Sequence, residues 1–192
     1  FINDINNTNV NISTLRLYAY NTTQYGSVEF PVVLEFLMNK DIEVLASWFS
    51  ENFLQVNASK TQAMSLGRSQ YAYVFYLYNN LIQTQKTLRI LGVTLDHNLT
   101  FKPYVNEILK KTCAKIATLS RLKHFVPKYV LVKLCKTYVL PHFEYCSPIL
   151  LGIRKTLKQK MESANDYGLR TILNAGSNRN YDELLNLASM RS

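Results

Sequence analysis

The side chains best suited to chemistry in this 192-residue sequence are seven lysines of its second half, which we predict to contact phosphates. They are Lys110, Lys111, Lys115, Lys133, Lys136, Lys155 and Lys158. Residues 101–192 carry 16 Lys and Arg against 6 Asp and Glu, whereas residues 1–100 carry 6 against 7. A basic block beside a nearly neutral one is typical of a module that faces a polyanion, so we expect RNA or DNA as its partner. A solvated basic surface that only keeps the chain soluble is the alternative.

Apolar residues at helical spacing predict that these lysines lie on the outer sides of three helices. The first helix begins at Pro103 and the second near Tyr129, with a kink or end at Pro141 and a stop at Pro148. The third helix is predicted from Lys155 to Leu173, and a short final helix from Tyr181 to Ala188. We therefore expect residues 102–192 to form a basic helical domain.

Residues 1–101 predict a β-rich domain with one packed helix. Thr14–Tyr18 and Thr22–Tyr25 alternate in polarity on either side of a bend at Asn21, as the strands of a β-hairpin do. A helix follows, with Ser27 as its N-cap and Pro31 in its first turn. Further strands are predicted at Lys60–Leu66, Tyr71–Leu77, Leu81–Ile82 and Leu88–Asp96. The fold class is thus α+β.

Other site chemistries find no support in the sequence. The three cysteines form no Cys-x-x-Cys pair, and their spacing to the histidines matches no zinc motif, so no metal site is expected. No stretch approaches the roughly 18 apolar residues of a membrane span. No secretory signal pattern is visible, and we expect an intracellular protein, nuclear or cytoplasmic, that does not bind a membrane.

Several short segments match one protein family in the order in which they occur. They are Phe1–Ile5, the hairpin Arg16–Tyr25, Asn57–Thr61 after Trp48, Leu91–Asp96, Leu140–Pro148 and Leu169–Asn174. Together they resemble the reverse transcriptase of non-LTR (LINE-type, jockey-like) retrotransposons. The resemblance implies that residues 1–101 are the C-terminal part of a polymerase palm and residues 102–192 a helical thumb. The fingers and the rest of the palm would then precede Phe1 in the same polyprotein.

The same resemblance implies a damaged catalytic site. In the family the hairpin turn carries two aspartates, and here their positions hold Tyr20 and Asn21. Two-metal polymerase chemistry needs anionic oxygens to hold Mg²⁺, whereas a phenol is neutral at pH 7 and an amide has no charge. Mg²⁺ serves the intact family, but we expect no cofactor and no polymerase activity in this chain.

Three further residues acquire roles from the resemblance. Lys60 matches a position suspected of donating a proton to the leaving pyrophosphate. Leu91 and Gly92 match the turn that grips the primer end. The expected function is that of an inactive RNA-directed DNA polymerase fragment that still binds nucleic acid. The alternative is a non-enzymatic structural or interaction remnant of a decayed element, which would expose apolar surface and self-associate.

Overall fold

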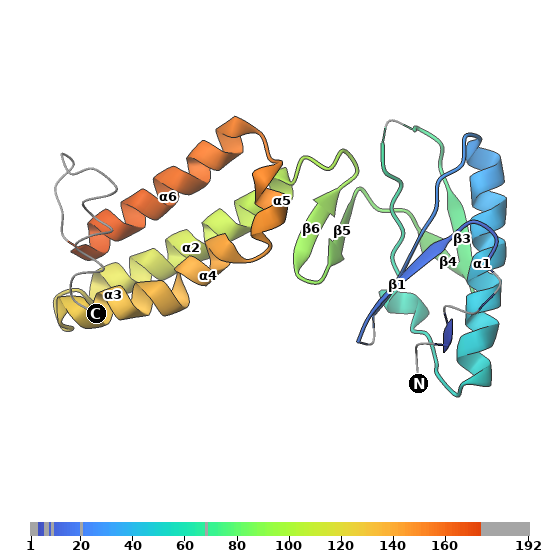
Figure 1. The fold of residues 1–192 in the computed structure, drawn as a ribbon, viewed down its shortest axis with the longest axis horizontal. Coiled ribbons are helices and arrows are strands. Elements are labelled where there is room, and N and C mark those ends of the chain that lie inside the picture. Colours follow the sequence, from blue (N-terminus) through green and yellow to red (C-terminus); the bar gives the residue numbers. More distant parts are fainter. Residues whose placement is uncertain (1–3, 6–7, 9, 20, 68, 174–192) are drawn as a thin grey trace. The chain divides into compact units, whose positions relative to one another are not determined.

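A computed structural model describes residues 4–5, 8, 10–19, 21–67 and 69–173 (Figure 1). The described residues form helices and three small two-stranded β-hairpins, so the predicted α+β class is confirmed. The chain divides into two compact units, residues 1–88 and 89–192. This boundary lies earlier than the predicted one after residue 101, because the third hairpin packs on the helix that follows it.

The first unit opens with the predicted hairpin. Strand β1 (Thr14–Tyr18) pairs antiparallel with β2 (Asn21–Tyr25), and Leu15 on β1 is buried. Helix α1 (Pro31–Glu51) follows. Its N-cap is Phe30 rather than the predicted Ser27, because the helix begins only at Pro31, whose fixed φ suits a first helical position.

The second hairpin covers one side of α1 (Figure 1). It consists of β3 (Val74–Leu77) and β4 (Asn80–Gln83), and its Phe75, Leu77 and Ile82 pack against Ala46 of α1. Two polar side chains of α1 also bond to the backbone of β3. Glu35 accepts the Val74 N–H at 2.8 Å, and Asn39 accepts the Tyr76 N–H and donates to the Val74 carbonyl, both at 2.9 Å. These side chains provide hydrogen-bond partners for backbone groups that an edge strand would otherwise leave unpaired.

The predicted strand at Lys60–Leu66 is wrong. Residues Ala58–Lys60 form a single 3₁₀ turn, η2, and Ala63 makes only an isolated parallel bridge to Thr84. The Asn57 side chain accepts hydrogen bonds from the Lys60 N–H and the Ser59 hydroxyl. Asn side chains that bond to nearby backbone groups favour turns over extended structure, and a turn forms here at Ala58–Lys60.

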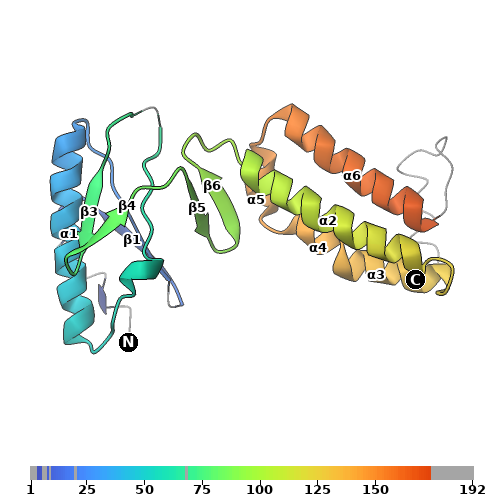
Figure 2. The same cartoon turned by 180° about the vertical axis from the view of Figure 1, so that it is seen from behind.

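The second unit begins with the third hairpin and continues as helices (Figure 2). The predicted strand at Leu88–Asp96 is in fact two strands, β5 (Thr87–Ile90) and β6 (Val93–Asp96), joined by a turn at Leu91–Gly92. The helices are α2 (Lys102–Leu122), α3 (Lys128–Tyr138), α4 (Leu140–Glu144), α5 (Ser147–Leu151) and α6 (Lys155–Leu173). Pro148 lies in the first turn of α5 instead of ending a helix. The predicted helix at Tyr181–Ala188 lies outside the described residues.

Helix α2 is central to the second unit, since it packs against α3, α6 and β6. One apolar cluster joins α2, α3 and α6 through Ile116, Leu131 and Leu169. A second joins β6, α2 and α6 through Val93, Val105, Ile108, Leu157 and Met161. These two clusters fix the helices on which the predicted phosphate-binding lysines lie.

Candidate nucleic-acid interface

Six of the seven predicted lysines have exposed side chains on three helices of the second unit. They are Lys110 and Lys111 on α2, Lys133 and Lys136 on α3, and Lys155 and Lys158 on α6. Among the residues that the structure describes, Arg170 and Asp166 form an ion pair at 2.8 Å, and none of the six lysines forms one. The six lysines are therefore free of acidic partners, as a surface that binds an external polyanion must be.

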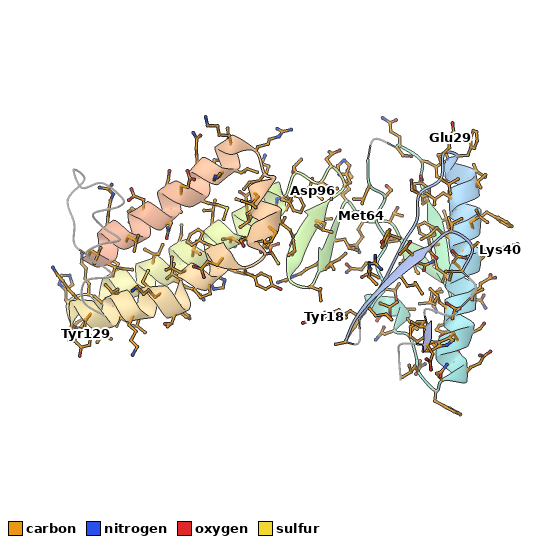
Figure 3. All side chains as sticks on the ribbon, in the orientation of Figure 1. Tyr18, Glu29, Lys40, Met64, Asp96 and Tyr129 are labelled. Carbon is orange, nitrogen blue, oxygen red and sulfur yellow. The ribbon has the colours of Figure 1, made fainter. Side chains whose placement is uncertain are left out.

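The unit has few acids to offset this charge, and most are engaged elsewhere. Residues 89–173 contain 15 Lys and Arg against 5 Asp and Glu. Asp96, at the end of β6 (Figure 3), is buried and accepts hydrogen bonds from Thr100 and from the Phe101 N–H, at 2.8–3.0 Å. Burial alone would raise the pKa of Asp96, but these hydrogen bonds outweigh it and lower the pKa. Glu107 accepts a 2.8 Å hydrogen bond from the Thr94 hydroxyl. Asp96 and Glu107 thus brace the hairpin and the start of α2, and Asp166 pairs with Arg170.

Lys115 differs from the other six lysines, and the expectation that it lies outside the packed side of α2 is wrong. It is partly buried, and its Nζ donates to the Tyr138 carbonyl at 3.1 Å and contacts Nε2 of His142. The ammonium also lies 3.7 Å from the centre of the Tyr138 ring, a cation–π contact. Lys115 therefore ties α2 to α3 and α4, and its donors are already occupied.

The environment of His142, including its contact with Lys115, shifts the pKa of His142. Partial burial disfavours the charged imidazolium, and the charges of Lys115 and Lys111 repel an added proton, so the pKa of His142 is lowered. A neutral ring can accept a hydrogen bond from Lys115, whereas a protonated ring cannot. Protonation of His142 would therefore remove this acceptor from the junction of α2 with α4.

The turn at Leu91–Gly92 lies at the exposed tip of the third hairpin. Both residues have positive φ, 48° and 84°, and both are exposed. The turn and the lysines belong to the same unit, although the predicted domain boundary separated them. Sequence reasoning did not single out Tyr145, which lies between α4 and α5 and contacts the turn.

The residues predicted to be the remains of a polymerase site belong to the first unit. Tyr20 lies outside the described residues. Asn21 is exposed at the start of β2, where it pairs with Tyr18 of β1, and Lys60 is exposed at the end of η2. Over the described residues, no three His, Cys, Asp or Glu side chains gather in a way that could hold a metal ion.

Asp41 is the described acid of the first unit with the most hydrogen bonds, and the sequence analysis did not identify it. Its buried carboxylate accepts hydrogen bonds from the backbone N–H groups of Asn11, Ile12 and Ser13 and from the side chains of Asn11 and Ser13, at 2.6–3.1 Å. Burial raises the pKa of Asp41, but these bonds outweigh it and lower the pKa below its ordinary value. The available signal was an acid at helical spacing from Leu34, Met38 and Leu45. Because donors already surround both oxygens, Asp41 anchors the segment before β1 and does not serve as a metal ligand.

Comparison with known proteins gives no relative from which a role could be transferred. The chain matches no protein-family model, no curated protein and no solved structure. No helix among the described residues combines the length and apolar character needed to cross a membrane. The function must therefore be argued from the surface itself.

Proposed function

We propose that this chain is a reverse-transcriptase palm and thumb fragment that lacks polymerase activity and holds nucleic acid through its second unit. One observation carries the binding part of the proposal: six exposed lysines on three packed helices have no acidic partner among the described residues. A lysine that is already paired with an acid contributes little to binding a polyanion. A lysine without an acidic partner that contacts a phosphate releases counterions from the nucleic acid, and this release favours binding.

The proposed recognition is of charge and shape, not of base sequence. Phosphate contacts position a protein on a nucleic acid but carry no sequence information. If all six lysines contact phosphates, the logarithm of the affinity should fall with the logarithm of salt concentration with a slope of about −5. Little sequence preference should accompany that slope.

The lack of polymerase activity rests on Tyr20 and Asn21. Neither side chain supplies the anionic oxygen that Mg²⁺ requires, and the lysine at position 60 cannot act as a general acid without a reacting phosphate. Primer extension on an RNA template with Mg²⁺ or Mn²⁺ should give no incorporation above a control without protein. Clear incorporation would refute this part of the proposal.

Fluorescence anisotropy of a labelled RNA–DNA hybrid duplex, titrated with the chain from about 50 to about 300 mM salt, tests the binding part. A Lys→Gln change at the six predicted lysines that are exposed should make the salt slope shallower by about 5. The matched control is Lys40→Gln with Lys86→Gln, because both lysines are exposed but belong to the first unit. Equal losses in the two variants would show that the charge of the second unit has no special role.

A non-enzymatic interaction role is the second candidate, and the N-terminal half of α1 favours it. Val32, Phe36 and, just before the helix, Phe30 are 63%, 58% and 63% exposed. Exposed apolar residues of this size mark association surfaces. Sedimentation of the chain as a single monomeric species across concentrations would contradict this candidate.

A further inference from the structure

The contact between Lys115 and His142 joins three helices of the second unit and depends on one proton. Nζ of Lys115 on α2 contacts Nε2 of His142 on α4. The same Nζ donates to the Tyr138 carbonyl on α3 at 3.1 Å and lies 3.7 Å from the centre of the Tyr138 ring. An ammonium group can only donate hydrogen bonds, so the ring nitrogen that it contacts must be an acceptor. The contact therefore requires a neutral His142.

The charged groups that face His142 are cations. Lys111 and Lys115 approach it from α2, and their charges add to the effect of burial in lowering the pKa of His142. Residues 108–143, which include the rest of α2 and all of α3, contain no Asp or Glu. The one acid of α4 is Glu144, and it forms no ion pair with His142 among the described residues. A proton on His142 thus has no acidic partner within the helices that surround it.

A proton on His142 would turn its contact with Lys115 into a repulsion between two cations. The ring would lose its acceptor, and the partly exposed Lys115 side chain would be free to turn toward solvent. Lys111 is exposed one helical turn before Lys115, on the same side of α2. Three cations would then lie together, an arrangement that an anion with several acceptor oxygens, such as a phosphate, stabilises.

We propose that His142 and Lys115, beside Lys111, form an additional phosphate contact of the bound nucleic acid when His142 takes up a proton. This inference rests on the proposed function, because the six exposed lysines of the unit would hold the same nucleic acid. While His142 is neutral, Lys115 stays engaged within the protein and contributes little to binding. Binding and protonation favour each other, since such a coupling between two bound species is reciprocal.

The salt dependence of binding at two pH values tests the inference. The affinity of the full chain for a labelled RNA–DNA hybrid duplex is measured by fluorescence anisotropy at about pH 7.5 and about pH 5.5, over a range of salt. Circular dichroism establishes that the chain is folded at each pH, and the lower pH is raised until the two spectra agree. At the lower pH the affinity in about 50 mM salt should rise by about tenfold, and the salt slope should become steeper by about 1.

Four variants assign this response to its residues. His142→Gln cannot take up a proton, so its slope should not become steeper as pH falls. His142→Lys is charged at both pH values, so its slope should already be steep at the higher pH and change little. Lys115→Gln should lose part of the response. The matched control is His124→Gln, because His124 is exposed in the same unit but lies in the connection between α2 and α3, and this variant should keep the wild-type response.

The outcomes separate this inference from the proposed function. A wild-type slope that is the same at both pH values overturns the inference and leaves the proposed function standing. An equal loss of the pH response in His142→Gln and His124→Gln also overturns it, because the response would then reflect positive charge in general. Failure of the wild-type chain to bind in about 50 mM salt at about pH 7.5 removes the proposed function, and this inference with it.

Discussion

Replacing Gly168 with alanine should destabilise the second unit, because a Cβ at this position of α6 would collide with a side chain of α2. A Cβ at position 168 would lie 2.7 Å from Cδ1 and 3.1 Å from Cγ1 of Ile116. Optimal separations between carbon atoms are about 3.5–4.0 Å. Ile116 is only 1% exposed, so its side chain has little free space to move into.

Two opposing effects set the size of the change. Overpacking of a well-packed core costs about 1–3 kcal/mol. Alanine in a helix interior is more favourable than glycine by about 1 kcal/mol. The free energy of unfolding should therefore fall by about 0–2 kcal/mol, because the higher helix propensity of alanine offsets part of the steric cost.

A double-mutant cycle isolates the steric part. Ile116→Val removes Cδ1 and alone should cost about 0.5–1.5 kcal/mol. In the Gly168→Ala background it should cost less or become favourable, giving a coupling of about 1 kcal/mol or more by urea unfolding followed by circular dichroism. Additive effects, or a Gly168→Ala variant that is more stable by about 1 kcal/mol, would refute the proposed close contact.

Gly152→Ala provides the control for this cycle. A Cβ at Gly152 would lie 3.9 Å from the Ile149 carbonyl oxygen, an ordinary van der Waals contact, and the φ of −87° is open to alanine. It should show no coupling with Ile116→Val.

Three further predictions concern charged groups. Asp41→Asn places an amide donor among N–H and O–H donors and should lower the free energy of unfolding by about 3 kcal/mol at neutral pH. Because the pKa of Asp41 in the folded chain lies below its ordinary 3.8, the wild type should be the more stable protein above pH 3.8, and this difference should disappear as pH falls through the folded pKa. The pKa of His142 in the folded chain lies below its ordinary 6.5, so the unfolded chain binds the proton first, and the free energy of unfolding should fall as pH drops from 6.5 to the folded pKa. His142→Gln should remove this part of the pH dependence of the urea midpoint. Lys115→Ala should destabilise the unit by about 1 kcal/mol and change the salt slope of nucleic-acid binding less than Lys110→Gln does, because Lys115 is engaged with Tyr138 and His142.

Local patterns predicted the elements well where the determining residues are close in sequence. The strands at Thr14–Tyr18 and near Thr22–Tyr25 and the helix at Lys155–Leu173 match the structure, because polarity alternation and helical periodicity act over a few residues. The strand predicted at Lys60–Leu66 failed because η2 takes up its first residue and, of the rest, only Ala63 has a bridge partner, Thr84; a local polarity pattern does not reveal whether a partner strand is present.

The interface was harder to predict because it depends on contacts between distant segments. Residue patterning predicted Leu91 inside a strand, whereas the resemblance placed Leu91 and Gly92 at a turn, and the structure has the turn between β5 and β6. Helical spacing placed Lys115 outside the apolar stripe of its own helix, but could not show that Tyr138 and His142 come to meet it. Tyr145 reaches its partner across 54 residues, and no local pattern carries that information.

The most direct test of the account is the change in salt slope when two neighbouring exposed lysines of α2 lose their charge. For the Lys110→Gln, Lys111→Gln variant bound to a labelled RNA–DNA hybrid duplex, the account predicts a slope shallower than the wild-type value by about 2. A slope equal to that of the wild type, or a wild-type chain that does not bind at about 50 mM salt, would contradict the claim that the second unit holds nucleic acid through its uncompensated lysines.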